Sequence, residues 1–172
     1  MRGCLLLVGA LTICGCATAR VEAVRDPAFH SRINRLLVVV VDEESNDADL
    51  MKASLHGQLE TKRIDHRIVA ISGASDAPRV DAVVSAFGPQ AILRIAPTAV
   101  IRSQSSRARL EIRYDASLFP ADDHEHRIWR ARLIHHAGAM IDSDESGMSH
   151  RMDLVAQQLV DRMIADGVIG PS

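Results

Sequence analysis

The chain contains few aromatic residues, and this shortage excludes a class of partner. Phenylalanine, tryptophan and tyrosine together make up 3% of the 172 residues, too few for a surface on which nucleic-acid bases could stack. The 20 basic residues are balanced by 22 acidic ones, so the chain also lacks the positive charge that general binding of polyanions requires. We therefore expect no nucleic-acid partner.

Motifs for catalysis are missing as well. The sequence contains no glycine-rich phosphate-binding loop and no dinucleotide fingerprint. The serines at residues 72–75 lack the flanking glycines of a nucleophile elbow. Other serines, histidines and aspartates occur in no arrangement that the sequence assembles into a triad. We expect a protein that is not an enzyme.

Long hydrophobic runs are also absent, and the apolar stretch near the amino terminus is typical of a signal sequence. Arg2 precedes an apolar run at residues 5–13, which is too short to span a bilayer. Gly15 supplies the small residue that is expected before a cleavage site. These features predict a signal peptide over residues 1–15.

The residues at the end of this segment resemble the lipobox of bacterial lipoproteins: Ile13, Cys14, Gly15 and Cys16. The resemblance implies that the signal is cut before Cys16, that this cysteine is acylated, and that its acyl chains anchor the protein stably in a membrane. Ala17 follows the cysteine, and in lipoproteins of this type alanine rather than aspartate usually permits export to the outer membrane. The implied location is the periplasmic face of the outer membrane.

Cysteine usage favours this interpretation. The three cysteines are Cys4, Cys14 and Cys16, so the mature chain would keep only the acylated one and could form no internal disulfide. The alternative is an ordinary signal that is cleaved near Ala17 or Ala19.

The segment after Cys16 shows neither a helical nor a strand period. It mixes small, polar and charged residues with one proline. We therefore expect the acylated cysteine and a flexible tether to occupy residues 16–31, and a single α/β domain to occupy residues 32–172.

Hydrophobic patterns in residues 32–172 predict the order β-α-β-α-β-β-β-α. The apolar run at residues 36–41 has no alternation, which is typical of a central strand buried on both faces. Residues 107–118 alternate without a break between apolar and polar side chains, which indicates a strand with one wet face. A hairpin turn leads to the last strand, at residues 126–135, in which Trp129, Ala131 and Leu133 are expected to face inward. Pro97, in the strand predicted at residues 91–101, suggests an edge, a bulge or a bend. The predicted fold is a mixed, α+β-like α/β domain whose helices pack on a mixed sheet of about five strands.

Arginines on the polar face of the predicted hairpin are the candidate binding residues. Such a row can grip carboxylates or phosphates in a bidentate way. The alternative is an ordinary solvated face on which Glu111 and Asp115 balance the charge. The candidates for binding a partner or an anion are Arg107, Arg109, Arg113, Arg130 and Arg132.

An acidic loop begins like a calcium site. Asp142, Asp144 and Ser146 stand at positions one, three and five, and Asp153 stands at position twelve, where calcium loops normally carry glutamate. The alternative is a solvated loop whose carboxylates favour the amino terminus of the next helix. Histidines and aspartates at residues 122–126 match no standard zinc spacing. We expect no cofactor, with calcium as the alternative.

Three short segments give a second resemblance: the strand at residues 91–95, Tyr114 to Ala116, and the pair Ile128 and Trp129. Together with the lipobox they resemble small envelope lipoproteins related to CsgG, LpoB and the amino-terminal domain of TolB. The resemblance implies an interaction or assembly module of the cell envelope, whose partner is an envelope protein or a second copy of the chain. The alternative function is a periplasmic lipoprotein that binds a ligand or calcium through the arginine face or the acidic loop.

Overall fold

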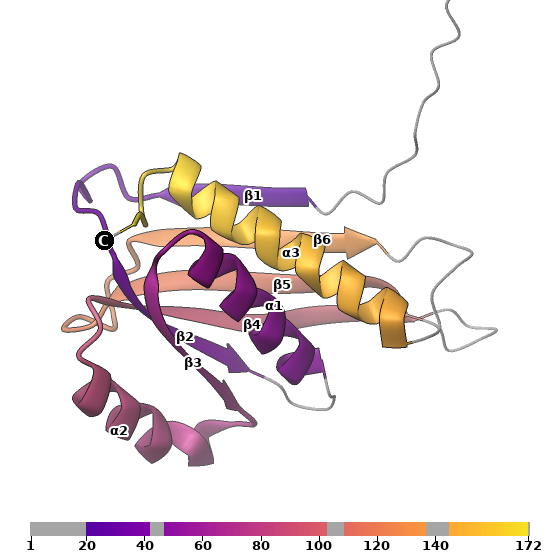
Figure 1. Ribbon diagram of the computed structural model, residues 1–172, viewed down its shortest axis with the longest axis horizontal. Coiled ribbons are helices and arrows are strands. Elements are labelled where there is room, and N and C mark those ends of the chain that lie inside the picture. Colours follow the sequence, from indigo (N-terminus) through magenta and orange to yellow (C-terminus); the bar gives the residue numbers. More distant parts are fainter. Residues whose placement is uncertain (1–19, 42–46, 103–108, 137–144, 172) are drawn as a thin grey trace, which may run out of the picture.

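The computed structural model describes residues 20–41, 47–102, 109–136 and 145–171 (Figure 1). These residues form a six-stranded mixed sheet in the order β1-β6-β5-β4-β2-β3, so the predicted α/β class is confirmed with one strand more than expected. The described elements are β1 (Arg20–Arg25), β2 (Arg35–Val41), α1 (Asp47–Thr61), β3 (Asp65–Ile71), the 3-10 helix η1 (Ala74–Asp76), α2 (Ala77–Phe87), β4 (Ala91–Arg102), β5 (Arg109–Pro120), β6 (Trp129–His136) and α3 (Glu145–Ala165).

Strand β2 lies inside the sheet, as its unbroken apolar run predicts. It pairs in parallel with β3 on one side and with β4 on the other. Leu36, Val38 and Val40 pack into the large core under α1 and α3, whereas Leu37 and Val39 pack into a second, smaller core. Because both faces are covered, every residue from Leu36 to Val41 is buried, and no polar side chain interrupts the run.

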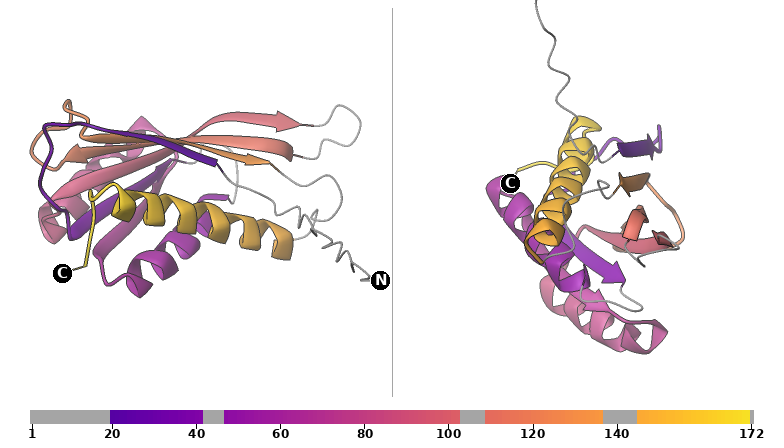
Figure 2. Two further views of the ribbon diagram at one scale, coloured as in Figure 1. Left: turned by 90° about the horizontal axis from the view of Figure 1, so that it is seen from above. Right: turned by 90° about the vertical axis from the view of Figure 1, so that its right-hand side faces the viewer.

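The helices cover the two faces of the sheet unequally. Helices α1 and α3 lie side by side on one face (Figure 2), where Met51, Leu55 and Leu159 are buried in the large core. Helix α2 lies on the opposite face near β2 and β3, and only Phe87 of this helix is buried. Among the described residues, no helix is both long and apolar enough to cross a membrane.

Strand β1 corrects the prediction of a flexible tether that extends to residue 31. It pairs antiparallel with β6 over its whole length, so that Val21 lies opposite Leu133 and Ala23 opposite Ala131. These two inward residues pack against the large core. Only Val21 and Ala23, of the six residues of β1, are apolar and face inward. The third apolar residue, Val24, points outward and is 74% exposed, so the strand lacks a clear alternating pattern.

Strands β4, β5 and β6 form the predicted antiparallel part of the sheet. Of the edge, bulge or bend that Pro97 suggested, the structure shows a bulge-like irregularity, since the register shifts between Pro97 and Ala99. Pairing with β2 ends before this point, at Ile95, so the missing proline N–H costs no hydrogen bond to β2. The last strand begins at Trp129 rather than at residue 126, because Asp123 accepts the backbone N–H groups of the residues that follow it in the turn.

Candidate functional site

The sheet surface opposite α1 and α3 carries three of the predicted arginines, Arg113, Arg130 and Arg132. We call the part of this surface formed by β1, β6, β5 and β4 the outer face. Inward and outward residues follow the predicted parity, since Trp129, Ala131 and Leu133 are buried while Arg130 and Arg132 are exposed. Helix α2 packs against β2, β3 and Ile92 at the start of β4, and no other described helix lies over the outer face (Figure 2).

The register of the strands brings arginines and carboxylates together across the outer face. Arg132 of β6 lies opposite Asp115 of β5 on one side and opposite Glu22 of β1 on the other. Arg130 donates from Nε to both carboxylate oxygens of Asp115, at 3.2 and 3.1 Å. These hydrogen bonds and the negative charge of Asp115 raise the pKa of the Arg130 guanidinium.

The remaining arginines differ in their partners. Arg113 forms an ion pair with Glu111 on the same strand, whereas Arg94 and Arg132 form no ion pair with any described residue. Arg109 is the first residue of β5 and lies opposite Arg102 of β4. Arg107 lies outside the described residues, so its place near this group remains a prediction.

The outer face can exchange its internal ion pairs for contacts with a partner. Ion pairs between exposed side chains contribute about 1 kcal/mol or less to stability. An incoming carboxylate or phosphate can therefore displace Asp115 from Arg130 at little energetic cost, while Arg132 is already available. Binding of an anion by this face remains a prediction from the sequence.

The calcium prediction falls partly outside the described residues. Asp142 and Asp144 lie outside them, and Ser146 belongs to the first turn of α3. Asp153 lies two turns further along α3 and accepts a hydrogen bond of 2.6 Å from the Ser54 hydroxyl of α1. That contact joins the two helices, and calcium binding remains a prediction.

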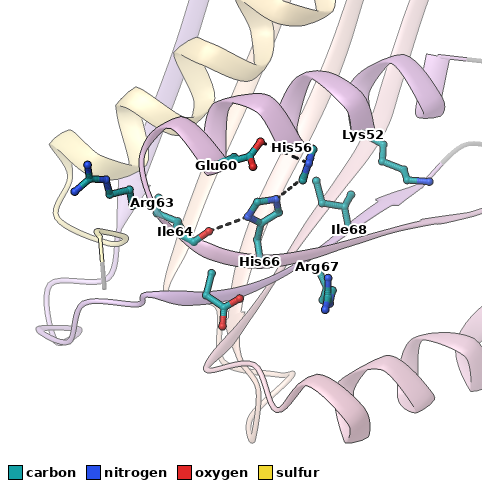
Figure 3. Close-up of a pocket in the computed structure, with 9 residues that line it drawn as sticks. Lys52, His56, Glu60, Arg63, Ile64, His66, Arg67 and Ile68 are labelled. Atoms are coloured by element: carbon teal, nitrogen blue, oxygen red, sulfur yellow. Dashed lines mark hydrogen bonds and ion pairs between the residues drawn. The ribbon is translucent and has the colours of Figure 1, made fainter.

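A pocket of about 580 Å³ lies between α1 and β3, on the sheet edge remote from β1 (Figure 3). Charged side chains and two histidines, His56 and His66, line it. Sequence reasoning missed this group, because the two histidines belong to different elements and match no motif. No group of three or more histidine, cysteine, aspartate or glutamate residues in the described part of the chain is placed to hold a metal.

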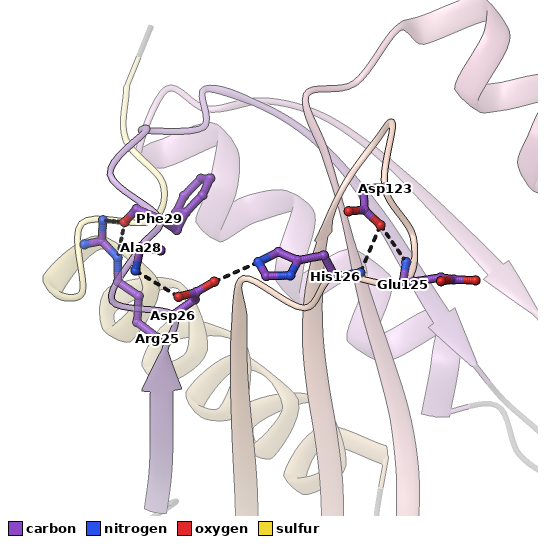
Figure 4. Close-up of polar contacts among 7 residues, drawn as sticks. All are labelled: Arg25, Asp26, Ala28, Phe29, Asp123, Glu125 and His126. Atoms are coloured by element: carbon purple, nitrogen blue, oxygen red, sulfur yellow. Dashed lines mark hydrogen bonds and ion pairs between the residues drawn. The ribbon is translucent and has the colours of Figure 1, made fainter.

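Polar contacts hold the end of β1 in place (Figure 4). Asp26 accepts a hydrogen bond of 2.8 Å from the Ala28 N–H and lies 2.7 Å from His126 Nε2 of the β5–β6 turn. Arg25 donates to the backbone oxygens of Phe29 and Asp166. The amino-terminal strand is therefore joined to both the β5–β6 turn and the carboxyl end of α3.

No protein-family model matches the chain, and no curated protein matches its sequence. Among solved structures, the chain is similar to the PelC dodecamer from Paraburkholderia phytofirmans, with a TM-score of 0.54 and 12% identity over 83% of this chain and 95% of that one. A point variant of PelC gives a TM-score of 0.53 and 16% identity over 81% and 97%. The lipoprotein GNA1162 from Neisseria meningitidis gives a TM-score of 0.44 and 14% identity over 74% and 99%. At these identities the likeness to PelC shows a shared fold, and the resemblance to CsgG, LpoB and TolB remains a prediction.

Proposed function

We propose that this chain is a non-enzymatic lipoprotein of the bacterial cell envelope that acts as an assembly module. Cys16 would carry the lipid anchor and hold the domain at the periplasmic face of the outer membrane. The support for this location is the resemblance of residues 13–16 to a lipobox. The outer face of the sheet would then bind a protein partner.

The observation that carries the proposal is the outer face itself. It spans four strands, of which the described helices cover only the start of β4, where Ile92 packs with α2. It combines Arg94, Arg130 and Arg132 with the apolar side chain of Val24. Arginine at the centre of an interface contributes strongly to binding, because its guanidinium makes several directed hydrogen bonds. A mixed surface of this kind suits a protein interface better than a bare phosphate site.

A second copy of the same chain is the partner that we favour. PelC shares the fold and forms a dodecamer, which supports self-association of this chain. The outer face presents both guanidiniums and the carboxylates of Glu22 and Asp115, so two copies can exchange ion pairs across an interface. A different envelope protein is the other outcome that the experiment below distinguishes.

Crosslinking in intact cells, followed by mass spectrometry, tests the proposal. We expect the wild-type chain to form crosslinks to itself, and the triple variant Arg94→Glu, Arg130→Glu, Arg132→Glu to lose most of them. The control variant Lys52→Glu, Arg79→Glu, Arg127→Glu changes the net charge equally at exposed sites outside the outer face and should keep them.

The possible results are clearly separated. If the wild type crosslinks to one other envelope protein and the triple variant loses those crosslinks, the outer face remains the interaction surface. The partner is then that protein and not a second copy of the chain. Crosslinks that persist unchanged in the triple variant, or their absence from the wild type, would contradict an interface on the outer face.

A further inference from the structure

His56 of α1 and His66 of β3 face each other across the pocket at the sheet edge (Figure 3). The distance from His56 Nδ1 to His66 Nε2 is 2.8 Å, and the ring centroids lie 5.0 Å apart. The two histidines are ten positions apart in the sequence, and the α1–β3 connection brings them together. The side chain of His56 is 62% exposed, so solvent and ions reach the pair.

The outer nitrogen of each ring has an oxygen beside it. His66 Nδ1 lies 2.8 Å from the backbone oxygen of Ile64. Because a carbonyl oxygen can only accept, this contact requires the proton of His66 to sit on Nδ1, which leaves a lone pair on Nε2. His56 Nε2 lies 3.8 Å from the carboxylate of Glu60, whose negative charge favours a proton on that nitrogen.

The 2.8 Å contact between the rings fits a hydrogen bond from Nδ1–H of His56 to the lone pair on Nε2 of His66. When the proton of His56 moves to its outer nitrogen, both facing nitrogens present a lone pair. One metal ion can then take the place of that proton between the rings. An oxygen acceptor on the outer nitrogen is also the contact that orients histidine ligands in metal sites.

We propose that His56 and His66 form a two-histidine site for a divalent transition metal of the zinc class. Imidazole nitrogen is a preferred ligand of zinc, copper and nickel. Zinc–nitrogen bonds of about 2.0–2.1 Å in tetrahedral geometry place two ligand nitrogens about 3.3 Å apart, so the rings must separate by about half an ångström and turn until both lone pairs point at the ion. Water molecules would complete the coordination, and the site does not depend on the proposed envelope function.

The charges around the pair set the conditions for binding. Protons compete with the metal for the facing nitrogens, so binding weakens as the pH falls. Cationic side chains in the pocket oppose a divalent ion and acidic ones favour it, which predicts modest affinity at neutral pH. The charged groups that line the pocket with the two histidines are Lys52, Glu60, Arg63, Asp65 and Arg67.

Calorimetric titration with Zn²⁺ tests the site. The protein is the tag-free chain without its signal sequence, carrying Cys16→Ser so that no thiol competes for the metal. We expect one ion per chain, with the affinity reduced at least about tenfold by either His56→Ala or His66→Ala. His150→Ala removes an exposed histidine of α3 and should leave the titration unchanged. Circular dichroism melts should show a higher melting temperature with zinc in the wild type and in His150→Ala only.

Two further measurements sharpen the result. Glu60→Gln keeps the shape of the side chain but removes its charge, and we expect it to weaken zinc binding by up to about tenfold without changing the stoichiometry. Alanine is a good helix former and position 56 is exposed, so His56→Ala should melt near the wild-type temperature without metal. Zinc binding of wild-type strength in both single histidine variants, or no binding by the wild type at about pH 7.5, would overturn the proposal.

Discussion

Asp26 shows how one side chain can secure an edge strand. Its carboxylate accepts the Ala28 N–H and contacts His126, and these two contacts, in that order, hold the pKa of Asp26 below its ordinary value of 3.8. The charged form of Asp26 is therefore bound more favourably in the folded chain than in the unfolded one. Its contribution to stability is present above pH 3.8 and is lost as the pH falls through the lower folded pKa.

Replacing Asp26 by asparagine should reveal this dependence on pH. We expect Asp26→Asn to be less stable than the wild type at about pH 6. The difference should shrink at about pH 3, which lies below 3.8, because there the carboxyl takes up a proton in the unfolded chain. Urea denaturation at both pH values measures the difference. Asp122→Asn in the neighbouring turn controls for the removal of an exposed charge. A difference of the same size at both pH values would show that the charge of Asp26 does not stabilise the fold.

Helices α1 and α2 have the same kind of apolar stripe but different burial. Ala48, Met51, Leu55 and Leu59 of α1 are all buried, because α1 packs against both the sheet and α3. Helix α2 packs only on the small core formed by β2, β3 and Ile92 of β4, where its three valines are partly buried. The layer that carries α1 and α3 should therefore contribute more to the stability of the fold.

Two truncations compare these helices. Leu55 is completely buried, and Leu55→Ala should lower the free energy of unfolding by about 2–5 kcal/mol. Val83 of α2 is partly exposed, and Val83→Ala should cost about 1 kcal/mol or less. Chemical denaturation, followed by both circular dichroism and tryptophan fluorescence, measures both changes and checks for two-state unfolding. Equal losses in the two variants would mean that the small core is as important as the large one.

At the scale of the whole molecule, strand β1 places the domain close to its proposed anchor. β1 begins at Arg20, so three residues separate it from Cys16. A chain of this length reaches at most about 14 Å when fully extended. If Cys16 carries the lipid, the β1 edge of the sheet must lie near the membrane surface.

Metabolic labelling with radioactive palmitate tests the anchor. We expect label in the wild type and in Cys14→Ser, which keeps a small residue before the cleavage site, and none in Cys16→Ser. The Cys16→Ser protein should also leave the membrane fraction, because no other anchor is proposed. Label that still enters Cys16→Ser, or a wild-type chain that takes up none, would refute acylation at Cys16.

Much of the architecture could be predicted from local patterns. The apolar run of β2 predicted a central strand, and Trp129, Ala131 and Leu133 were assigned to the inward side of β6 from their alternation alone. Pro97 indicated the irregularity of β4. These predictions succeeded because burial of an apolar face leaves a periodic trace in the residues of that element itself.

The edge strand and the contacts of the candidate sites could not be predicted in this way. β1 has only two inward apolar residues, and its pairing with β6 joins segments that are more than 100 residues apart. The contact between Arg130 and Asp115 depends on the register of β5 and β6. The contact between His56 and His66 depends on the path of the chain from α1 to β3.

The sequence by itself determined the mixed α/β class, the central strand and the outward parity of the arginines, because each follows from the separation of apolar and polar side chains within one segment. The tertiary structure alone decided that residues 20–25 complete the sheet, which arginines face carboxylates and which two histidines meet. Those features depend on hydrogen bonds and distances between remote segments, and such contacts leave little trace in either segment taken alone.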